Sequence, residues 1–142
     1  MILRLAKFFI LLLCFSMAVI AEGTDKGSFS SPSVADRKQI TRKIDFSGKA
    51  QVATNRKVWF FVYSAEADLY YLSLTRQDGE NWKANDVLIG SDKDSGQSFT
   101  VGLFSVSDQD SLRLYRTLKF VDKVAYFPSS TQQLDKISVT RK

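Results

Sequence analysis

The sequence predicts an all-β protein, an antiparallel sandwich of two sheets with about seven strands. From Ile40 onward, short runs rich in β-branched and aromatic residues follow one another, and strands favour these residue types. Turn-forming Gly, Asn, Asp and Ser residues separate the runs. Helical spacing is confined to one stretch. Many short strands with little helix favour two packed antiparallel sheets over other architectures.

The strand predictions follow from the local pattern of side chains. The segment 40–46 alternates apolar and polar residues, and Ser47-Gly48 is expected to end it in a turn. The segment 57–64 is apolar on both faces, as a central strand of a two-layer fold would be. Strands are expected at 40–46, 49–53, 57–64, 69–75, 82–89, 98–106 and 136–140.

Three further features complete the expected chain path. Asp78-Gly79 suits the positive φ angles of a tight turn, so 82–89 is expected to return antiparallel. The alternation of that strand breaks near Asn85-Asp86, which indicates a β-bulge. Leu112, Tyr115 and Leu118 recur at spacings of three. This spacing predicts a short helix near 110–118, with an irregular crossover as the alternative.

Residues 1–21 have the three-part pattern of a secretory signal peptide. Arg4 and Lys7 form a basic start without acidic residues, and the apolar run 8–20 follows. Val19 and Ala21 place small side chains at a cleavage site. The run of about 13 residues is shorter than the roughly 20 that a membrane span needs. We therefore expect cleavage near Ala21 and an exported protein, periplasmic or secreted, with no stable membrane insertion afterwards.

Two alternatives to a plain, cleaved signal peptide carry less weight. Cys14 would be a lipid attachment site if a small residue preceded it, but Leu13 does. The second alternative is a signal anchor that stays uncleaved.

Removing the leader leaves 121 of the 142 residues, the length of one domain. The segment 22–37 is rich in Gly, Ser and other small polar residues and is expected to be a flexible linker. The sandwich domain is expected to span 38–142. Without Arg4 and Lys7, 18 basic residues stand against 15 acidic ones, a net charge of +3. So small a charge, spread along the chain, argues against a nucleic-acid partner.

Missing residue types exclude more function classes than any motif suggests. The chain has no histidine, and its only cysteine lies in the leader. Hydrolases that use a histidine base, zinc sites, haem and iron–sulfur clusters lose their usual side chains. Carboxylate pairs, Ser-Lys dyads, tyrosine chemistry and oxygen-ligated cations remain. We therefore expect no enzyme activity and no cofactor, with calcium as the one candidate ion.

The order of these segments resembles a bacterial extracytoplasmic β-sandwich domain of immunoglobulin or fibronectin type III character. The run KVWFFV precedes a reversal, Trp82 precedes VLIG, and DSGQSFTVGLFSVSD follows. The matching positions are Trp59, Trp82, Gly90, Gly96, Phe99 and 137–141. The resemblance covers roughly 40–142. The chain departs from it in lacking a Pro-Asp-Gly type turn near the first strand and in its long 107–128 connection. The resemblance implies a ligand- or partner-binding accessory module and brings no catalytic residues.

Aromatic residues near one hairpin are the candidate binding site. Tyr70 and Tyr71 are adjacent in a predicted strand and must point to opposite faces, so one ring is expected to be exposed. An exposed ring beside Trp82 would stack on a sugar or anchor a protein partner. The alternative with more weight is that all three rings pack in the core or across strands.

Acidic loops are the candidate metal site. Asp92 and Asp94 lie in a loop that contains Gly96, and Asp108 and Asp110 lie in another loop. Calcium prefers six to eight oxygen ligands, and such loops supply some of them. The match to a calcium-binding loop is partial, because Leu103 stands where a bidentate Glu would close it. Solvated turn residues are the alternative with more weight.

Two other charged sets were considered as sites. The acids Glu66, Asp68, Asp78 and Glu80 would serve a glycoside hydrolase if two carboxyl groups stood about 5–9 Å apart. The bases Arg113, Arg116, Lys119 and Lys123 recur at helical spacing and would form a stripe that meets anionic lipid or lipopolysaccharide. A solvated helix face is the commoner explanation for such a stripe.

The sequence therefore predicts an exported, non-enzymatic binding or accessory domain that acts through protein or glycan contacts. The first alternative is a structural component of an envelope or secretion assembly that pairs through an edge strand. The second is a small carboxylate-dependent hydrolase of the cell envelope.

Overall fold

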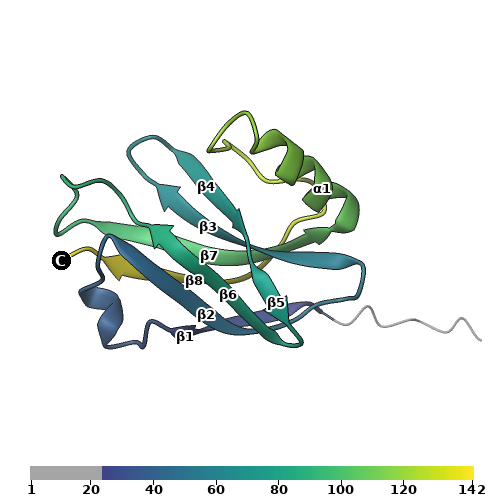
Figure 1. Ribbon diagram of the computed structural model, residues 1–142, viewed down its shortest axis with the longest axis horizontal. Helices are drawn as coiled ribbons and strands as arrows, with labels where there is room; N and C mark the ends of the chain where they lie inside the picture. Colours follow the sequence, from purple (N-terminus) through teal and green to yellow (C-terminus); the bar gives the residue numbers. More distant parts are fainter. Residues whose placement is uncertain (1–23) are drawn as a thin grey trace, which may run out of the picture.

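The computed structural model describes residues 24–142, and these form a sandwich of two four-stranded antiparallel sheets (Figure 1). The predicted all-β fold class is confirmed. The strands are β1 (Lys26–Ser31), β2 (Lys43–Gln51), β3 (Arg56–Ser64), β4 (Leu69–Leu74), β5 (Arg76–Asp78), β6 (Asn81–Leu88), β7 (Ser98–Ser107) and β8 (Gln132–Thr140). The helices are η1 (Asp36–Lys38) and α1 (Asp108–Thr117). The predicted signal peptide lies outside the described residues.

The first sheet has the strand order β1-β2-β6-β5 and the second sheet has the order β4-β3-β7-β8. The chain changes sheets between β4 and β5, at the buried residue Thr75. Its backbone N–H and its hydroxyl group both donate hydrogen bonds to the Val58 carbonyl, at 3.3 and 2.7 Å. In the described part of the chain, no helix is long and apolar enough to cross a bilayer.

The core between the sheets is largely aromatic and β-branched. The Phe46 and Phe60 ring centroids lie 4.9 Å apart, and Phe29 meets Trp82 edge-on at 5.1 Å. Trp82 is fully buried, and its indole N–H donates to the Ser28 carbonyl. Other buried members of this core are Ile40, Val58, Ile89, Val101, Leu103 and Val139.

Gly48 lies within a strand rather than in the turn expected at Ser47-Gly48. Strand β2 continues through it, and Gly48 pairs with Trp82 on β6. A Cβ atom on Gly48 would stand 1.8 Å from the Ser28 carbonyl oxygen and 2.9 Å from the Trp82 indole nitrogen. The glycine therefore makes room for the close approach of β1 at Ser28 and for the indole that donates to it. The predicted strands 40–46 and 49–53 thus fall largely within one strand.

Part of the expected flexible linker 22–37 forms a strand. Strand β1 pairs antiparallel with β2, and Phe29 packs against the core between the sheets. Just before it, the buried Asp25 carboxylate pairs with the Arg56 guanidinium at 2.7 Å and accepts a hydrogen bond from the Ser105 hydroxyl at 2.6 Å. The polar composition of this segment does not reveal the strand. Its order depends on the Phe29 ring and the Asp25 carboxylate, whose contacts lie far along the chain.

The β-bulge predicted near Asn85-Asp86 is confirmed. Ile44 pairs with Val87 and Phe46 pairs with Ala84, so two residues on β6 face one on β2. Asp86 has a φ of 56°, and its N–H donates to the Asp45 carboxylate at 2.7 Å.

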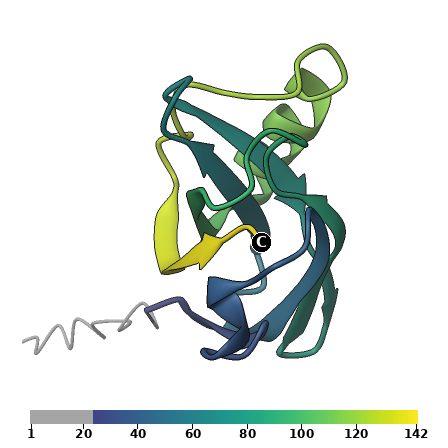
Figure 2. The ribbon, with the colours of Figure 1, turned by 90° about the vertical axis from the view of Figure 1, so that its left-hand side faces the viewer.

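The connection between β7 and β8, residues 108–131, folds over the outer face of the second sheet (Figures 1 and 2). We call these residues the insertion. The predicted helix near 110–118 is α1, which begins at Asp108 after the N-cap Ser107. Leu114 on the inward side of α1 belongs to a buried cluster with Trp59, Phe61, Leu72, Phe104 and Val106. The Trp59 indole N–H donates to the Ser111 hydroxyl at 3.0 Å. The covered face explains why β3 is apolar on both sides.

Candidate functional site

The three predicted aromatic site residues lie in three different environments. Trp82 has no exposed surface, so it cannot contact a ligand from solvent. Tyr70 packs under the insertion, with its ring centroid 4.5 Å from that of Phe127. Tyr71 remains 38% exposed, and the Lys123 ammonium lies 5.9 Å from its ring centroid. Only Tyr71 is therefore available for the predicted contact.

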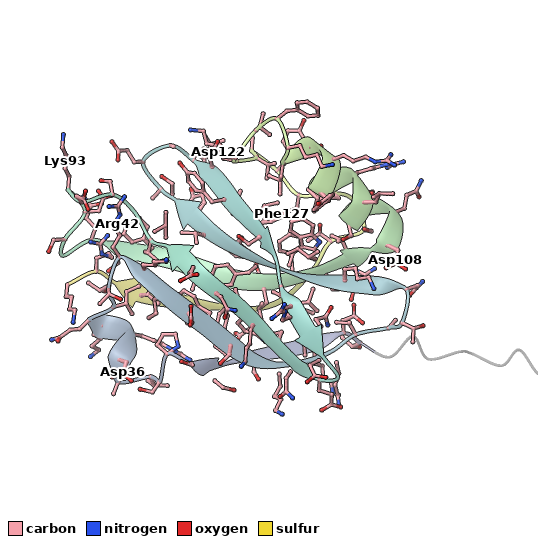
Figure 3. All side chains as sticks on the ribbon, viewed as in Figure 1. Asp36, Arg42, Lys93, Asp108, Asp122 and Phe127 are labelled. Carbon is pink, nitrogen blue, oxygen red and sulfur yellow. The ribbon has the colours of Figure 1, made fainter. Side chains whose placement is uncertain are left out.

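The two predicted acidic loops lie at opposite ends of the sandwich. Strand β7 runs from Ser98 to Ser107 between them, and ten residues at about 3.3 Å each separate the loops by roughly 30 Å. Figure 3 shows this separation between Lys93, which lies between Asp92 and Asp94, and Asp108. The two loops therefore cannot share one ion. Within residues 24–142, no group of three or more His, Cys, Asp or Glu side chains could hold a metal ion.

Each of these four carboxylates has a partner within the protein. Asp92 pairs with Arg42 at 2.6 Å, and Asp108 lies 3.8 Å from the Lys57 ammonium. Asp94 accepts a hydrogen bond from the Ser91 backbone N–H, which lowers the pKa of its carboxyl group below the usual value. These contacts satisfy oxygen atoms that a cation would otherwise bind.

Asp110 helps to close the base of the insertion. The Ser130 hydroxyl donates to the Asp110 carboxylate and accepts a hydrogen bond from the Ser107 N–H. The Ser107 hydroxyl in turn accepts from the Asp110 N–H, so Ser130 takes part in a helix-capping network. The hydrogen bond from Ser130 lowers the pKa of Asp110 below its usual value. The network joins the first residues of α1 to the chain just before β8.

The acids considered for hydrolysis are also divided between two ends. Strands β4 and β5 together separate Asp68 from Asp78, so the pairs 66/68 and 78/80 cannot flank one bond. Asp68 accepts a hydrogen bond from the Tyr63 hydroxyl at 2.7 Å, which raises the pKa of Tyr63 above its usual value. Glu80 accepts one from Gln51. These contacts give Asp68 and Glu80 structural roles.

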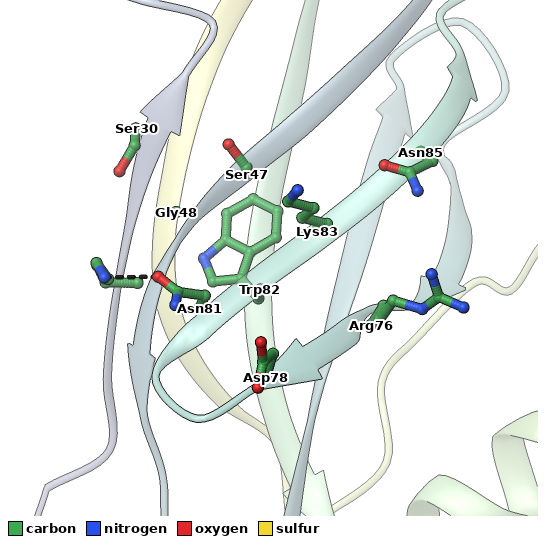
Figure 4. A pocket seen from close by; sticks show the side chains of 10 residues that line it. Ser30, Ser47, Gly48, Arg76, Asp78, Asn81, Trp82, Lys83 and Asn85 are labelled. Atoms are coloured by element: carbon green, nitrogen blue, oxygen red, sulfur yellow. Dashed lines mark hydrogen bonds between the residues drawn. The ribbon is translucent and has the colours of Figure 1, made fainter.

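The outer face of the first sheet holds a polar depression of about 650 Å³ (Figure 4). Lys49, Arg76 and Lys83 lie around it, and the Lys49 ammonium donates to the Asn81 side chain at 2.5 Å. Ser30, Ser47, Asp78 and Asn85 complete the rim. Fully buried Trp82 contributes no exposed ring to it. The depression is a solvated polar face.

A groove of about 590 Å³ lies beside Tyr71, between the β3–β4 and β6–β7 connections. Leu88 and Phe99 contribute apolar surface to it, and the carboxylates are Glu66, Asp94 and Asp122. The groove therefore combines residues of the β3–β4 connection, the β6–β7 connection and the insertion.

The most exposed apolar side chains lie on the insertion. Phe120 is 89% exposed and Tyr126 is 82% exposed. The exposed apolar residues here are Leu112, Tyr115, Phe120, Val121 and Tyr126, and the bases among them are Arg113, Arg116, Lys119 and Lys123. We call these nine residues the insertion surface. Figures 1 and 2 both place α1 and the loop after it at one extremity of the molecule.

The insertion surface differs from the basic stripe considered in the sequence. Helix α1 ends at Thr117, so Arg113 and Arg116 are helical whereas Lys119 and Lys123 lie in the following loop. The pattern of bases identified the region but not its exposed rings. The interleaving of Phe120 and Val121 between two lysines is the signal that would have found them.

No protein-family model, curated protein or solved structure matches this chain.

Proposed function

We propose that this protein is an exported, non-enzymatic binding module of immunoglobulin type, and that the insertion surface contacts its partner. The observation that carries the proposal is the concentration of exposed apolar side chains. Among the described residues, nine large hydrophobic side chains are exposed, and five of them belong to the insertion surface. Exposed apolar patches of this kind are typical of interaction sites.

The strand order supports the immunoglobulin type. In an immunoglobulin domain, one sheet has the order A-B-E-D and the other contains C, F and G, with C′ added beside C in some types. The orders β1-β2-β6-β5 and β4-β3-β7-β8 correspond to A-B-E-D and C′-C-F-G. The insertion then occupies the F–G connection, at an end of the sandwich where loops commonly carry function.

The insertion is built to hold a contact surface in place. Its inward side chains pack on the second sheet, with Leu114 buried and Phe127 against Phe104 at 4.7 Å. Its outward side chains are apolar and basic and lie free of the core. A stable base with rigid aromatic groups reduces the entropy that a partner must overcome on binding.

Two of the four edge strands, β5 and β4, give less support to the alternative of strand pairing in an assembly, whereas β8 is an edge of nine residues. Strand β5 has three residues. Strand β4 already exchanges two backbone hydrogen bonds with the insertion, between Tyr70 and Val124. Pairing with another chain favours a long and uncovered edge.

Site-specific photo-crosslinking tests the proposal. A photoreactive phenylalanine analogue at Phe120 or Tyr126 should form adducts in the cells that naturally make the protein. The matched control replaces Val34, which is 74% exposed and precedes η1 by two residues; Figure 3 shows Asp36, the first residue of η1, far from α1. Adducts from positions 120 and 126 but not from 34 support the proposal. Equal labelling at all three positions, or no adduct at any, would contradict it.

A further inference from the structure

We propose that the insertion surface docks on an anionic phospholipid bilayer. This inference rests on the proposed function and names its partner. The insertion surface carries an excess of basic residues. Between residues 111 and 126, the four bases of the insertion surface stand against a single acid, Asp122. Bases near an anionic membrane surface are attracted to it.

The bases are available for such a contact. Arg113 lies 3.3 Å from the Asp110 carboxylate, but within residues 24–142 the other three, Arg116, Lys119 and Lys123, form no ion pair. All three side chains are exposed. The charges are therefore not already balanced by neighbouring carboxylates.

Apolar side chains lie directly among these bases. Phe120 and Val121 stand between Lys119 and Lys123 in the loop, and Tyr126 is exposed nearby in the chain. The Lys119 ammonium lies 5.1 Å from the Tyr115 ring centroid, so base and ring share one patch. At a membrane interface, rings and aliphatic groups enter the acyl boundary while lysine stems extend their ammonium groups to the phosphates.

The form of the surface favours a bilayer over a protein partner. Phe120 and Tyr126 are each more than four-fifths exposed, so most of each ring projects into solvent. Aromatic residues and arginine suit both kinds of partner, but lysine is depleted in protein–protein interfaces and is favoured at membrane interfaces, so Lys119 and Lys123 decide for the bilayer. The buried Leu114 and the Ser107–Ser130–Asp110 network hold the base of the patch.

The molecule contains its own control for charge alone. The depression on the first sheet also has three bases, Lys49, Arg76 and Lys83. No large exposed apolar side chain accompanies them there. If docking needs both charge and apolar insertion, the first sheet should contribute little to it.

Vesicle co-sedimentation of residues 22–142 tests the inference. Phosphatidylcholine vesicles that contain phosphatidylglycerol should bind the protein, and vesicles of phosphatidylcholine alone should bind it far less. The triple change Arg116→Glu, Lys119→Glu and Lys123→Glu should weaken binding roughly 100-fold, since each base near an anionic surface contributes to affinity. High salt should weaken binding of the unchanged protein as well.

Two further variants separate the contribution of apolar insertion from that of charge. Phe120→Ser with Tyr126→Ser should weaken binding roughly tenfold or more because apolar insertion is lost. The matched triple change Lys49→Glu, Arg76→Glu and Lys83→Glu alters the net charge equally and should leave most of the binding. Equal losses from the two triple variants would overturn the inference, as would equal binding to both kinds of vesicle.

The outcome is also distinguishable from that of the proposed function. Protein adducts from positions 120 and 126, together with no vesicle binding, would overturn the bilayer as partner while retaining the contact surface. Absence of both adducts and vesicle binding would overturn the two proposals together.

Discussion

The outer faces of the two sheets differ in composition and in what covers them. On the first sheet, the outward side chains of β6 are polar except for Leu88 at its end, and they lie bare in solvent, as Lys83 and Asn85 do (Figure 4). On the second sheet, the outward side chains of β3 and β7 include Trp59, Phe61 and Phe104, and the insertion covers them. One outer face of the sandwich is therefore polar and solvated, and the other is apolar and buried beneath the insertion.

The contrast between the two faces shows how a connection between strands becomes a second layer. Side chains on a strand alternate between faces, so a sheet face left apolar must be buried by something other than the opposite sheet. Helix α1 and the loop after it supply this burial with Leu114 and Phe127. Their outward residues are then free of any role in the core. This freedom is what leaves the insertion surface for binding.

The largest expected effect comes from opening the covered face. Phe104→Ala should destabilise the protein by about 3–5 kcal/mol, because the ring is 1% exposed and its removal leaves a cavity. Lys83→Ala on the bare face should change stability by about 0.5 kcal/mol or less. Urea unfolding of both variants measures the contrast. Similar losses in the two would show that the insertion does not bury a second core.

The two faces were not equally predictable from sequence. Unbroken apolar runs at 57–64 predicted a central strand, and alternation at 82–89 predicted a half-buried one. Both predictions are confirmed. The sequence of β3 does not show which segment covers its outer face. That depends on how residues 52 positions later in the chain, such as Ser111 relative to Trp59, fold back over the sheet. The insertion was recognised only as a short helix within a long connection.

The errors have the same non-local origin. Strand β1 was missed because its order depends on Phe29 in the core and on the Asp25–Arg56 pair. For Trp82, core packing is the alternative to which the sequence gives more weight and the one that the structure shows, whereas its role as a contact residue is wrong. Alternation along a strand assigns residues to two faces, but the positions of partners decide which face is buried.

A smaller effect is expected from crowding the covered face. Gly102 on β7 pairs with Phe61, and an added Cβ would stand 2.3 Å from the Phe61 ring. Gly102→Ala should therefore cost about 1–3 kcal/mol as the ring is displaced beneath the insertion. The control is Ser30→Ala, which is exposed on the bare face. Thermal unfolding compares the stability of the two variants. A Gly102→Ala variant as stable as the wild type would mean that the insertion accommodates the displaced ring without cost.

Acid should loosen the closure of the insertion. The pKa of Asp110 is lowered from its usual value of 3.8 because the Ser130 hydroxyl donates to its carboxylate. A carboxyl group with a lowered folded-state pKa stabilises the protein above the unfolded value, and this contribution is lost as the pH falls through the folded value. The stability difference between the wild type and Asp110→Asn should therefore shrink as the pH falls below about 3.8.

The pH effect has a control on the bare face. Asp78 is exposed there, and Asp78→Asn should follow the wild-type dependence more closely than Asp110→Asn does. Denaturant unfolding at a series of acidic pH values measures the three proteins. A constant difference between the wild type and Asp110→Asn would contradict a stabilising role for the ionised carboxylate.

The smallest expected effect on stability comes from the outward side of the cover. Phe120→Ser with Tyr126→Ser should change the free energy of unfolding by about 0.5 kcal/mol or less, because both rings are largely exposed in the folded protein. By contrast, Phe104→Ala, in the apolar cluster that the insertion covers, should strongly destabilise the protein. A large loss from the double variant would mean that these rings support the fold, and exposed apolar groups kept for stability would need no partner. Unchanged stability, measured by urea unfolding, leaves contact with a partner as the physical reason for exposing them.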